Sequence, residues 1–71
     1  MDTYRIDISY YGKVEYTYEY TDKKEAHHDY WYYYHNGYGA VELYVNGVKM
    51  EKEEDIINAL GPKPRKGFTI I

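Results

Sequence analysis

Aromatic side chains are the most abundant chemical resource of this chain, which contains 12 tyrosines, one tryptophan and one phenylalanine among 71 residues. Tyrosine and tryptophan rings supply rigid contact area, and their polar groups can hydrogen-bond at the same time. His28, Trp31, Tyr32 and His35 follow the i, i+3, i+4, i+7 spacing of one helix face. This spacing predicts an aromatic stripe that binds a partner.

Two further groups are expected to add to this contact surface. Tyr44, Glu15 and Glu19 fall on the polar side of strands with alternating polarity, so we expect them on the open face of a sheet. The alternative is that the stripe is partly structural. In that case Trp31 packs over the sheet edge or beneath the C-terminal segment, as side chains of small domains often do.

Residues for catalysis are scarce. Ser9 is the only serine and lies in a strand pattern without a nucleophile-elbow context, and no glycine-rich phosphate loop is present. The acidic residues of the strands and of the segment 53–55 are best explained as solvated charges and helix-dipole partners. We therefore predict no catalytic residue and no enzymatic activity.

The three histidines do not have the spacing of a metal site. His27 and His28 are neighbours and point about 100° apart on a helix, whereas His28 and His35 are about 10 Å apart along it. A zinc ion needs its ligands within about 2.0–2.3 Å of one point. We predict no metal ligand and no cofactor, unless a site is shared between subunits.

Composition narrows the class of protein further. The chain has no cysteine, so it has neither disulfides nor a thiolate zinc site, and its length suits one domain, residues 1–71. The net charge of -3 argues against broad affinity for phosphate backbones. No apolar run approaches the roughly 20 residues of a membrane span, and no signal peptide precedes the first strand. We expect a cytoplasmic protein that does not bind membranes.

The first part of the chain predicts a hairpin. Tyr4 to Tyr10 and Val14 to Tyr20 both carry aliphatic or tyrosine side chains at even positions, which gives the hairpin one apolar face. A loop at 11–13, or a Gly12-Lys13 turn with a bulge, keeps the two apolar faces together. The resulting register places Ile8 opposite Tyr16, Ile6 opposite Tyr18, and Arg5 opposite Glu19 in an ion pair.

A helix is expected next, from about Lys23 to His35. Asp22 followed three residues later by Glu25 resembles a capping box, and Asn36-Gly37 is a typical helix stop. At 3.6 residues per turn, one side of this helix should cover the hairpin. The residues on that side are Ala26, Tyr30, Tyr33 and Tyr34.

The second half predicts another hairpin, a short helix and a tail. Asn46-Gly47 is a strong two-residue turn signal that pairs Val45 with Val48, and the same register places Leu43 and Met50 on the core face. Residues 51–61 suit a short helix with acids in its first turn, ended by Gly61-Pro62. Residues 62–71 form a basic and then apolar tail, which we expect to dock as an edge strand or a clasp.

These elements predict an α+β two-layer sandwich. Residues 3–50 form a ββαββ core, and a right-handed crossover through the main helix places the third strand beside the first. The expected sheet is antiparallel, has the strand order 2-1-3-4 and carries the main helix on one face.

A cysteine-free, acidic domain with this strand-strand-helix-strand-strand core, from Tyr4 to Met50, resembles small proteins encoded by phages and other mobile elements, including anti-CRISPR and related anti-defence inhibitors. The resemblance implies a protein that acts in the cytoplasm of a host cell. It further implies that the protein occupies the nucleic-acid-binding or effector surface of a host protein. Such inhibitors share no common motif, so no functional residue is transferred.

The expected function is therefore that of a non-catalytic, tyrosine-rich and acidic protein-binding module, which inhibits a basic or nucleic-acid-handling partner. One alternative is a module that binds single-stranded nucleic acid by stacking bases on Tyr11, Tyr44 and Trp31. Another is self-assembly, for example as a homodimer, through edge strands or the aromatic helix.

Overall fold

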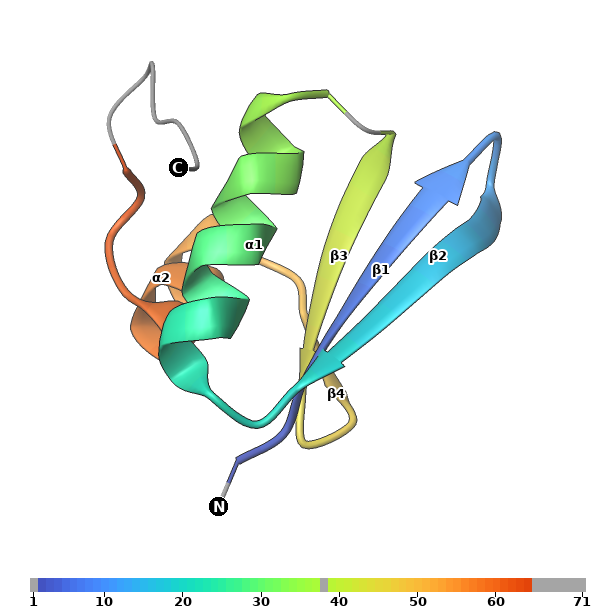
Figure 1. Ribbon diagram of the computed structural model, residues 1–71. Helices are drawn as coiled ribbons and strands as arrows, with labels where there is room; N and C mark the ends of the chain where they lie inside the picture. Colours follow the sequence, from blue (N-terminus) through green and yellow to red (C-terminus); the bar gives the residue numbers. More distant parts are fainter. Residues whose placement is uncertain (1, 38, 65–71) are drawn as a thin grey trace.

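The computed structural model describes residues 2–37 and 39–64 and forms a sheet with two helices on one side of it (Figure 1). In chain order the elements are β1 (Tyr4–Tyr10), β2 (Lys13–Tyr20), α1 (Lys23–His35), β3 (Ala40–Val45), β4 (Val48–Met50) and α2 (Glu53–Leu60). The sheet is antiparallel with the order β2-β1-β3-β4. The predicted α+β class and the strand order 2-1-3-4 are confirmed.

The turn between β1 and β2 differs from the expected one. Tyr10 pairs with Lys13, so the two turn residues are Tyr11 and Gly12, with φ angles of 54° and 79°. Positive φ at both positions matches the twist of hairpin strands, which is why this turn forms although tyrosine disfavours that conformation. The bulge falls between Tyr16 and Val14, where the partner shifts from Ile8 to Ser9.

This bulge changes which face Val14 occupies. Val14 was expected on the apolar face, but it pairs with Ser9 and is 48% exposed. Ser9 lies on the face opposite Ile8, because successive strand residues alternate. The predicted pairs of Ile6 with Tyr18 and Ile8 with Tyr16 are confirmed.

Helix α1 begins and ends at the predicted residues. The Asp22 side chain accepts a hydrogen bond from the Lys24 backbone N–H at 3.1 Å, which satisfies one of the free donors at the helix start. At the other end the Asn36 backbone N–H donates to the Tyr32 carbonyl. Both ends are thus stabilised by local bonds that the sequence encodes.

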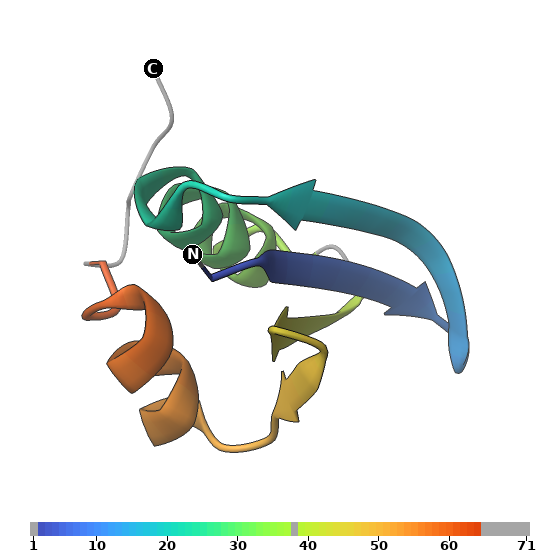
Figure 2. The same cartoon turned by 90° about the horizontal axis from the view of Figure 1, so that it is seen from below.

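The core lies between the sheet and the two helices, which sit side by side (Figure 2). Ile6, Ile8 and Leu43 come from the sheet, Tyr30 and Trp31 from α1, and all five are at most 3% exposed. From α2, Ile56 and Leu60 complete the cluster. Helix α1 therefore packs on the sheet along one side and on α2 along another.

The second hairpin forms as predicted, with Asn46-Gly47 at the turn and Val45 paired with Val48. Asn46 also joins this turn to the start of β1, because its backbone N–H donates to the Thr3 carbonyl and its side chain accepts from the Thr3 N–H. Val48 was expected in the core but is 62% exposed. It lies at the hairpin end, where the helices do not reach.

Helix α2 begins two residues later and ends one residue earlier than the expected range 51–61. Gly61 ends it with a φ of 123°, and its N–H donates to the Ile57 carbonyl. The following segment returns to α1, where the His27 ring nitrogen Nε2 hydrogen-bonds the Pro62 carbonyl at 2.7 Å. The predicted docking of the tail concerns residues 65–71, which lie outside the described residues.

Substitution of Gly39 tests how closely the backbone before β3 approaches β1. Its φ is +76°, and a Cβ added there would lie 2.5 Å from the Ser9 carbonyl oxygen. We expect Gly39→Ala to destabilise the fold more than Gly47→Ala does, because Gly47 has a similar φ of +82° and open space. The control, Gly47→Ala, should lower the free energy of unfolding by about 1–2 kcal/mol, because alanine disfavours a positive φ. Steric overlap should add about 1–3 kcal/mol for Gly39→Ala, measured by urea unfolding. Equal losses would contradict the close approach.

Candidate functional site

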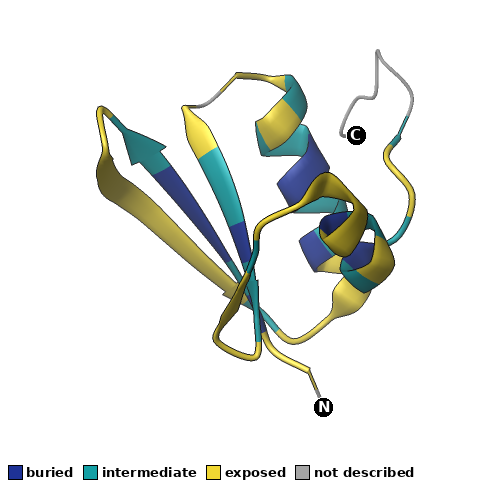
Figure 3. Cartoon of the chain, turned by 180° about the vertical axis from the view of Figure 1, so that it is seen from behind, coloured by how far each residue is buried: buried dark blue, intermediate teal, exposed yellow. Residues whose placement is uncertain are grey.

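Strand β2 is the most exposed element of the sheet. Every residue from Lys13 to Glu19 is exposed, and Tyr20 is half-buried. Figure 3 shows β2 exposed along its length beside the buried middle of β1. Four strands spaced by about 4.8 Å span about 14 Å, whereas one helix with its side chains is about 10–12 Å wide. The helices cover the other strands, so side chains on both faces of β2 reach solvent.

Tyrosine rings of this hairpin and of α1 form an ordered row, which we call the tyrosine array. Its members are Tyr10, Tyr16, Tyr18 and Tyr33. Tyr10 meets Tyr16 edge-on at 6.4 Å between ring centroids, Tyr16 stacks on Tyr18 at 6.4 Å, and Tyr18 stacks on Tyr33 at 5.4 Å. Tyr16 is 53% and Tyr18 is 37% exposed. The array is thus held by its own contacts, while the rings of Tyr16 and Tyr18 stay accessible and those of Tyr10 and Tyr33 are half-buried.

Helix α1 anchors one end of the array. Tyr33 projects from α1 onto Tyr18, and the Tyr20 hydroxyl donates to Asp29 Oδ2 at 2.7 Å. Asp29 also accepts from the His28 ring at 3.0 Å when that nitrogen carries a proton. Aromatic pairs are worth about 0.5–1.5 kcal/mol each. The end of β2 near α1 is therefore fixed, and the end at Tyr11-Gly12 projects away from the helices (Figure 2).

The surroundings of the array are acidic. Glu15 and Glu19 lie exposed on β2, and Asp29 lies beside its anchored end. Burial, followed by the neighbouring Tyr18 phenol and the Asp29 charge, raises the pKa of Tyr33 to about 12. Tyrosines with an ordinary pKa near 10 are already neutral at physiological pH, so the negative charge near the array comes from carboxylates. Such a surface attracts cations and repels phosphates.

Trp31 is not part of an exposed surface, which corrects the expectation of an accessible stripe around it. Its residue exposure is 0%, and its ring packs edge-on against Tyr30 at 5.0 Å and Tyr34 at 5.2 Å. The Lys63 ammonium lies 4.8 Å from the Tyr34 ring and 5.8 Å from the Trp31 ring. Helix α2 and the segment after it supply the cover that the aromatic spacing alone did not reveal.

The exposure of the other aromatic residues of α1 also differs from the prediction. Tyr34 was expected in the core but is 44% exposed, and Tyr33 is half-buried. His28, Tyr32 and His35 are likewise half-buried. The structure separates the predicted stripe, because Tyr32 contacts Tyr33 at 5.5 Å and His35 lies 6.3 Å from Trp31. Of the predicted stripe, only Tyr32 lies beside the tyrosine array, through its contact with Tyr33.

The opposite sheet face carries a network of charges. Asp7 is 6% exposed and accepts a hydrogen bond from the Thr17 hydroxyl at 3.1 Å. Arg5 forms its ion pair with Asp7 at 3.2 Å, although its cross-strand neighbour is Glu19 as predicted. The Arg5 guanidinium also lies 4.0 Å from the centroid of the Tyr44 ring. Tyr44 is therefore half-buried and engaged within the protein.

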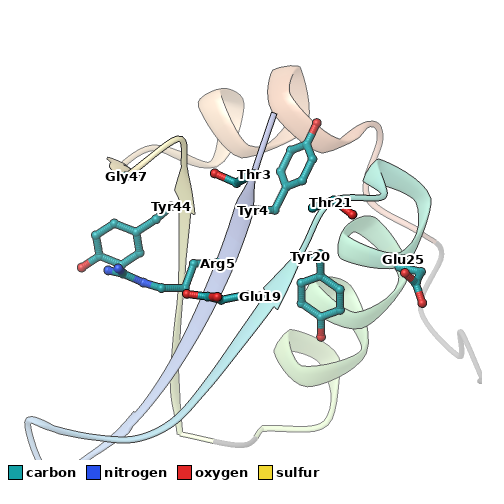
Figure 4. Close-up of a pocket in the computed structure, with 9 residues that line it drawn as sticks. All are labelled: Thr3, Tyr4, Arg5, Glu19, Tyr20, Thr21, Glu25, Tyr44 and Gly47. Carbon is teal, nitrogen blue, oxygen red and sulfur yellow. The ribbon is translucent and has the colours of Figure 1, made fainter. Parts of the chain in front are cut away.

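A cavity of about 610 Å³ lies at the end of the sheet near the start of β1 (Figure 4). Figure 4 shows Arg5 between Tyr44 and Glu19, so the structure brings these two predicted contact residues to one hollow. The other polar groups of its lining are Thr3, Tyr4, Tyr20, Thr21 and Glu25. Because Asp7 and Tyr44 already engage its cation, Arg5, this hollow is a weaker candidate site than the array.

The described residues offer neither a metal cluster nor a membrane-spanning helix. Within residues 2–37 and 39–64, no three histidine, cysteine or acidic side chains cluster closely enough to hold a metal ion. In the same part of the chain, no helix combines the length and apolar character needed to cross a bilayer.

Comparison with known proteins adds no assignment, since no protein-family model, curated protein sequence or solved structure matches the chain. The case for the tyrosine array as a site therefore comes from the structure alone. The sequence contained one signal for it. The strand order 2-1-3-4 places Tyr16 and Tyr18 on an edge strand, and a single main helix is too narrow to cover all four strands.

Substitutions should distinguish the buried ring from the exposed ones. We expect Trp31→Ala to destabilise the protein by about 3–5 kcal/mol, because it leaves a cavity between the helices. Tyr16→Ala should cost no more than about 1 kcal/mol, since the ring is half-exposed. Urea unfolding followed by circular dichroism measures both. Acrylamide should quench Trp31 fluorescence poorly in the folded wild type, and efficient quenching would contradict its burial.

The raised pKa of Tyr20 predicts that the protein loses stability at alkaline pH. Burial, followed by the hydrogen bond to Asp29 and its charge, raises the pKa of Tyr20 above 10.0. The stabilisation is complete below pH 10 and is lost as pH rises towards the folded-state pKa, because the unfolded chain then releases its proton first. Tyr20→Phe should cost about 0.5–1.5 kcal/mol at pH 7 and less at pH 11. Guanidinium unfolding at both pH values tests this, and a constant difference would contradict it.

Proposed function

We propose that the protein is a non-catalytic binding module that recognises a protein partner through the tyrosine array and the acidic side chains of β2. The observation that carries this proposal is the exposure of ordered rings: Tyr16 and Tyr18 stack on each other yet remain 53% and 37% exposed. Tyrosine is a preferred residue of binding surfaces because it offers large contact area with few rotatable bonds. Rings already held in place lose little further entropy on binding.

Charge indicates the kind of partner. Glu15 and Glu19 alternate with the rings along β2, so Glu19 lies on the other face of the same strand, and the chain has a net charge of -3. Complementary potentials increase association rates and select partners, so the favoured partner carries lysine or arginine. Arginine and lysine also bind the faces of aromatic rings. A basic surface of this kind is typical of proteins that handle nucleic acid.

We therefore extend the proposal to inhibition in the cytoplasm of a host cell. The acidic, ring-bearing hairpin would occupy the basic surface of a nucleic-acid-handling or defence protein and exclude its normal ligand. Single-stranded nucleic acid itself is a weaker candidate ligand. The rings of Tyr16 and Tyr18 can stack with bases, but Glu15 and Glu19 repel the phosphates that supply most of the affinity in such complexes.

Affinity capture from cells that carry the gene tests the proposal. We expect wild-type protein to retain a specific partner and the double variant Tyr16→Ala, Tyr18→Ala to lose at least about 90% of it, because removing central aromatic contacts costs about 2 kcal/mol or more. Tyr34→Ala is the matched control, since it removes a 44% exposed ring of α1 whose contacts with the rings of Tyr30 and Trp31 lie outside the array. Mass spectrometry quantifies the captured protein, and circular dichroism verifies folding.

Two results would contradict the proposal. One is equal capture by the double variant and the wild type. The other is binding of a labelled oligothymidylate at 50 mM salt that disappears at about 500 mM salt and in the double variant, which would indicate the nucleic-acid alternative.

A further inference from the structure

Besides its exposed rings, the first hairpin has a free backbone edge along β2. In the described sheet β2 pairs with β1 alone, and it is eight residues long. Its pairing is regular from Tyr16 to Tyr20, beyond the bulge. An edge strand exposes a row of backbone N–H and C=O groups that can pair with another strand. Strand addition of this kind is a common mode of peptide recognition.

The side chains on the two faces of β2 determine which contacts an added fifth strand would make. Tyr16 and Tyr18 lie on the helix side, opposite Ile8 and Ile6. Thr17 and Glu19 lie on the other side, where they pair with Asp7 and Arg5. Because an added strand alternates in the same way, its residues would contact rings on one face and a carboxylate on the other.

We propose, building on the proposed function, that the free edge of β2 binds an extended segment of the partner as a fifth strand, with lysine or arginine facing Glu19 and aliphatic residues facing Tyr16 and Tyr18. Charge complementarity selects this occupant. Antiparallel pairing with a second copy is disfavoured in the register centred on Thr17, because it places Glu15 of each copy opposite Glu19 of the other.

Synthetic peptides test the inference on the intact protein. The probe is a nine-residue peptide in which lysine and isoleucine alternate, and the control has the same composition with its lysines contiguous. We expect the alternating peptide to bind at least about tenfold more tightly, because only it presents separate basic and aliphatic faces. Amide hydrogen exchange by NMR should show protection of every second amide between Tyr16 and Tyr20, those on the open edge.

A charge exchange provides the matched variant. Glu19 is exposed, so Glu19→Lys should leave the fold intact. The variant should lose affinity for the lysine–isoleucine peptide and gain affinity for a glutamate–isoleucine peptide. An unchanged preference in the variant would overturn the predicted pairing of cations with Glu19.

The outcomes separate this inference from the proposed function. Equal binding of both peptides without alternate amide protection would overturn strand addition, and so would the failure of both to bind. Alternate protection without any peptide, increasing with protein concentration, would identify a second copy as the occupant and would also overturn it. The capture experiment with Tyr16→Ala, Tyr18→Ala tests the side-chain surface independently, because those substitutions leave the backbone edge in place.

Discussion

The packing of α1 against the central strands determines which aromatic rings of this protein are buried. Ala26, Tyr30 and Trp31 of α1 are all buried in one cluster with residues of the sheet and of α2. A helix is narrower than a four-stranded sheet, so two helices placed over β1, β3 and β4 leave the outer strand β2 uncovered. The exposed rings and the free backbone edge both result from this placement.

Exposure of β2 would ordinarily make a hairpin unstable, and the tyrosine array compensates for part of the missing core. Tyr18 stacks on Tyr33 of the helix, and Tyr20 donates to Asp29, so the strand is attached to α1 at one end. Stacking continues outward through Tyr16 to Tyr10. The contacts that stabilise the hairpin therefore also order the surface that we propose for binding, and the carboxylates beside it disfavour pairing between copies.

Much of the fold follows from local signals. The alternation in the first hairpin, the Asp22 cap and the Asn46-Gly47 turn give elements at the expected positions, and short antiparallel connections leave few strand orders to choose from. The turn at Tyr11-Gly12 was missed. Its positive φ values are unfavourable for tyrosine locally, and only the twist of the two paired strands selects them.

The site was less predictable than the fold. Helix α1 carries aromatic residues around much of its circumference, so the 3.6-residue period does not indicate which of Trp31 and Tyr34 enters the core. The structure buries Trp31 in the cluster shared with the sheet and α2 and leaves Tyr34 44% exposed. Likewise, the pattern assigned Tyr16 and Tyr18 to the apolar face correctly, but facing the helix layer did not make them part of the core.

The amino-acid sequence by itself determines where the main helix and the Asn46-Gly47 turn lie and which segments form strands, since these depend on alternation, capping and turn residues within a few positions of each other. It also determines the acidity and the abundance of rings. Only the tertiary structure decides which rings meet solvent, because burial depends on neighbours brought from distant parts of the chain. Trp31 is buried in a cluster that includes Ile56 and Leu60 of α2, whereas Tyr16, on an edge strand, is 53% exposed.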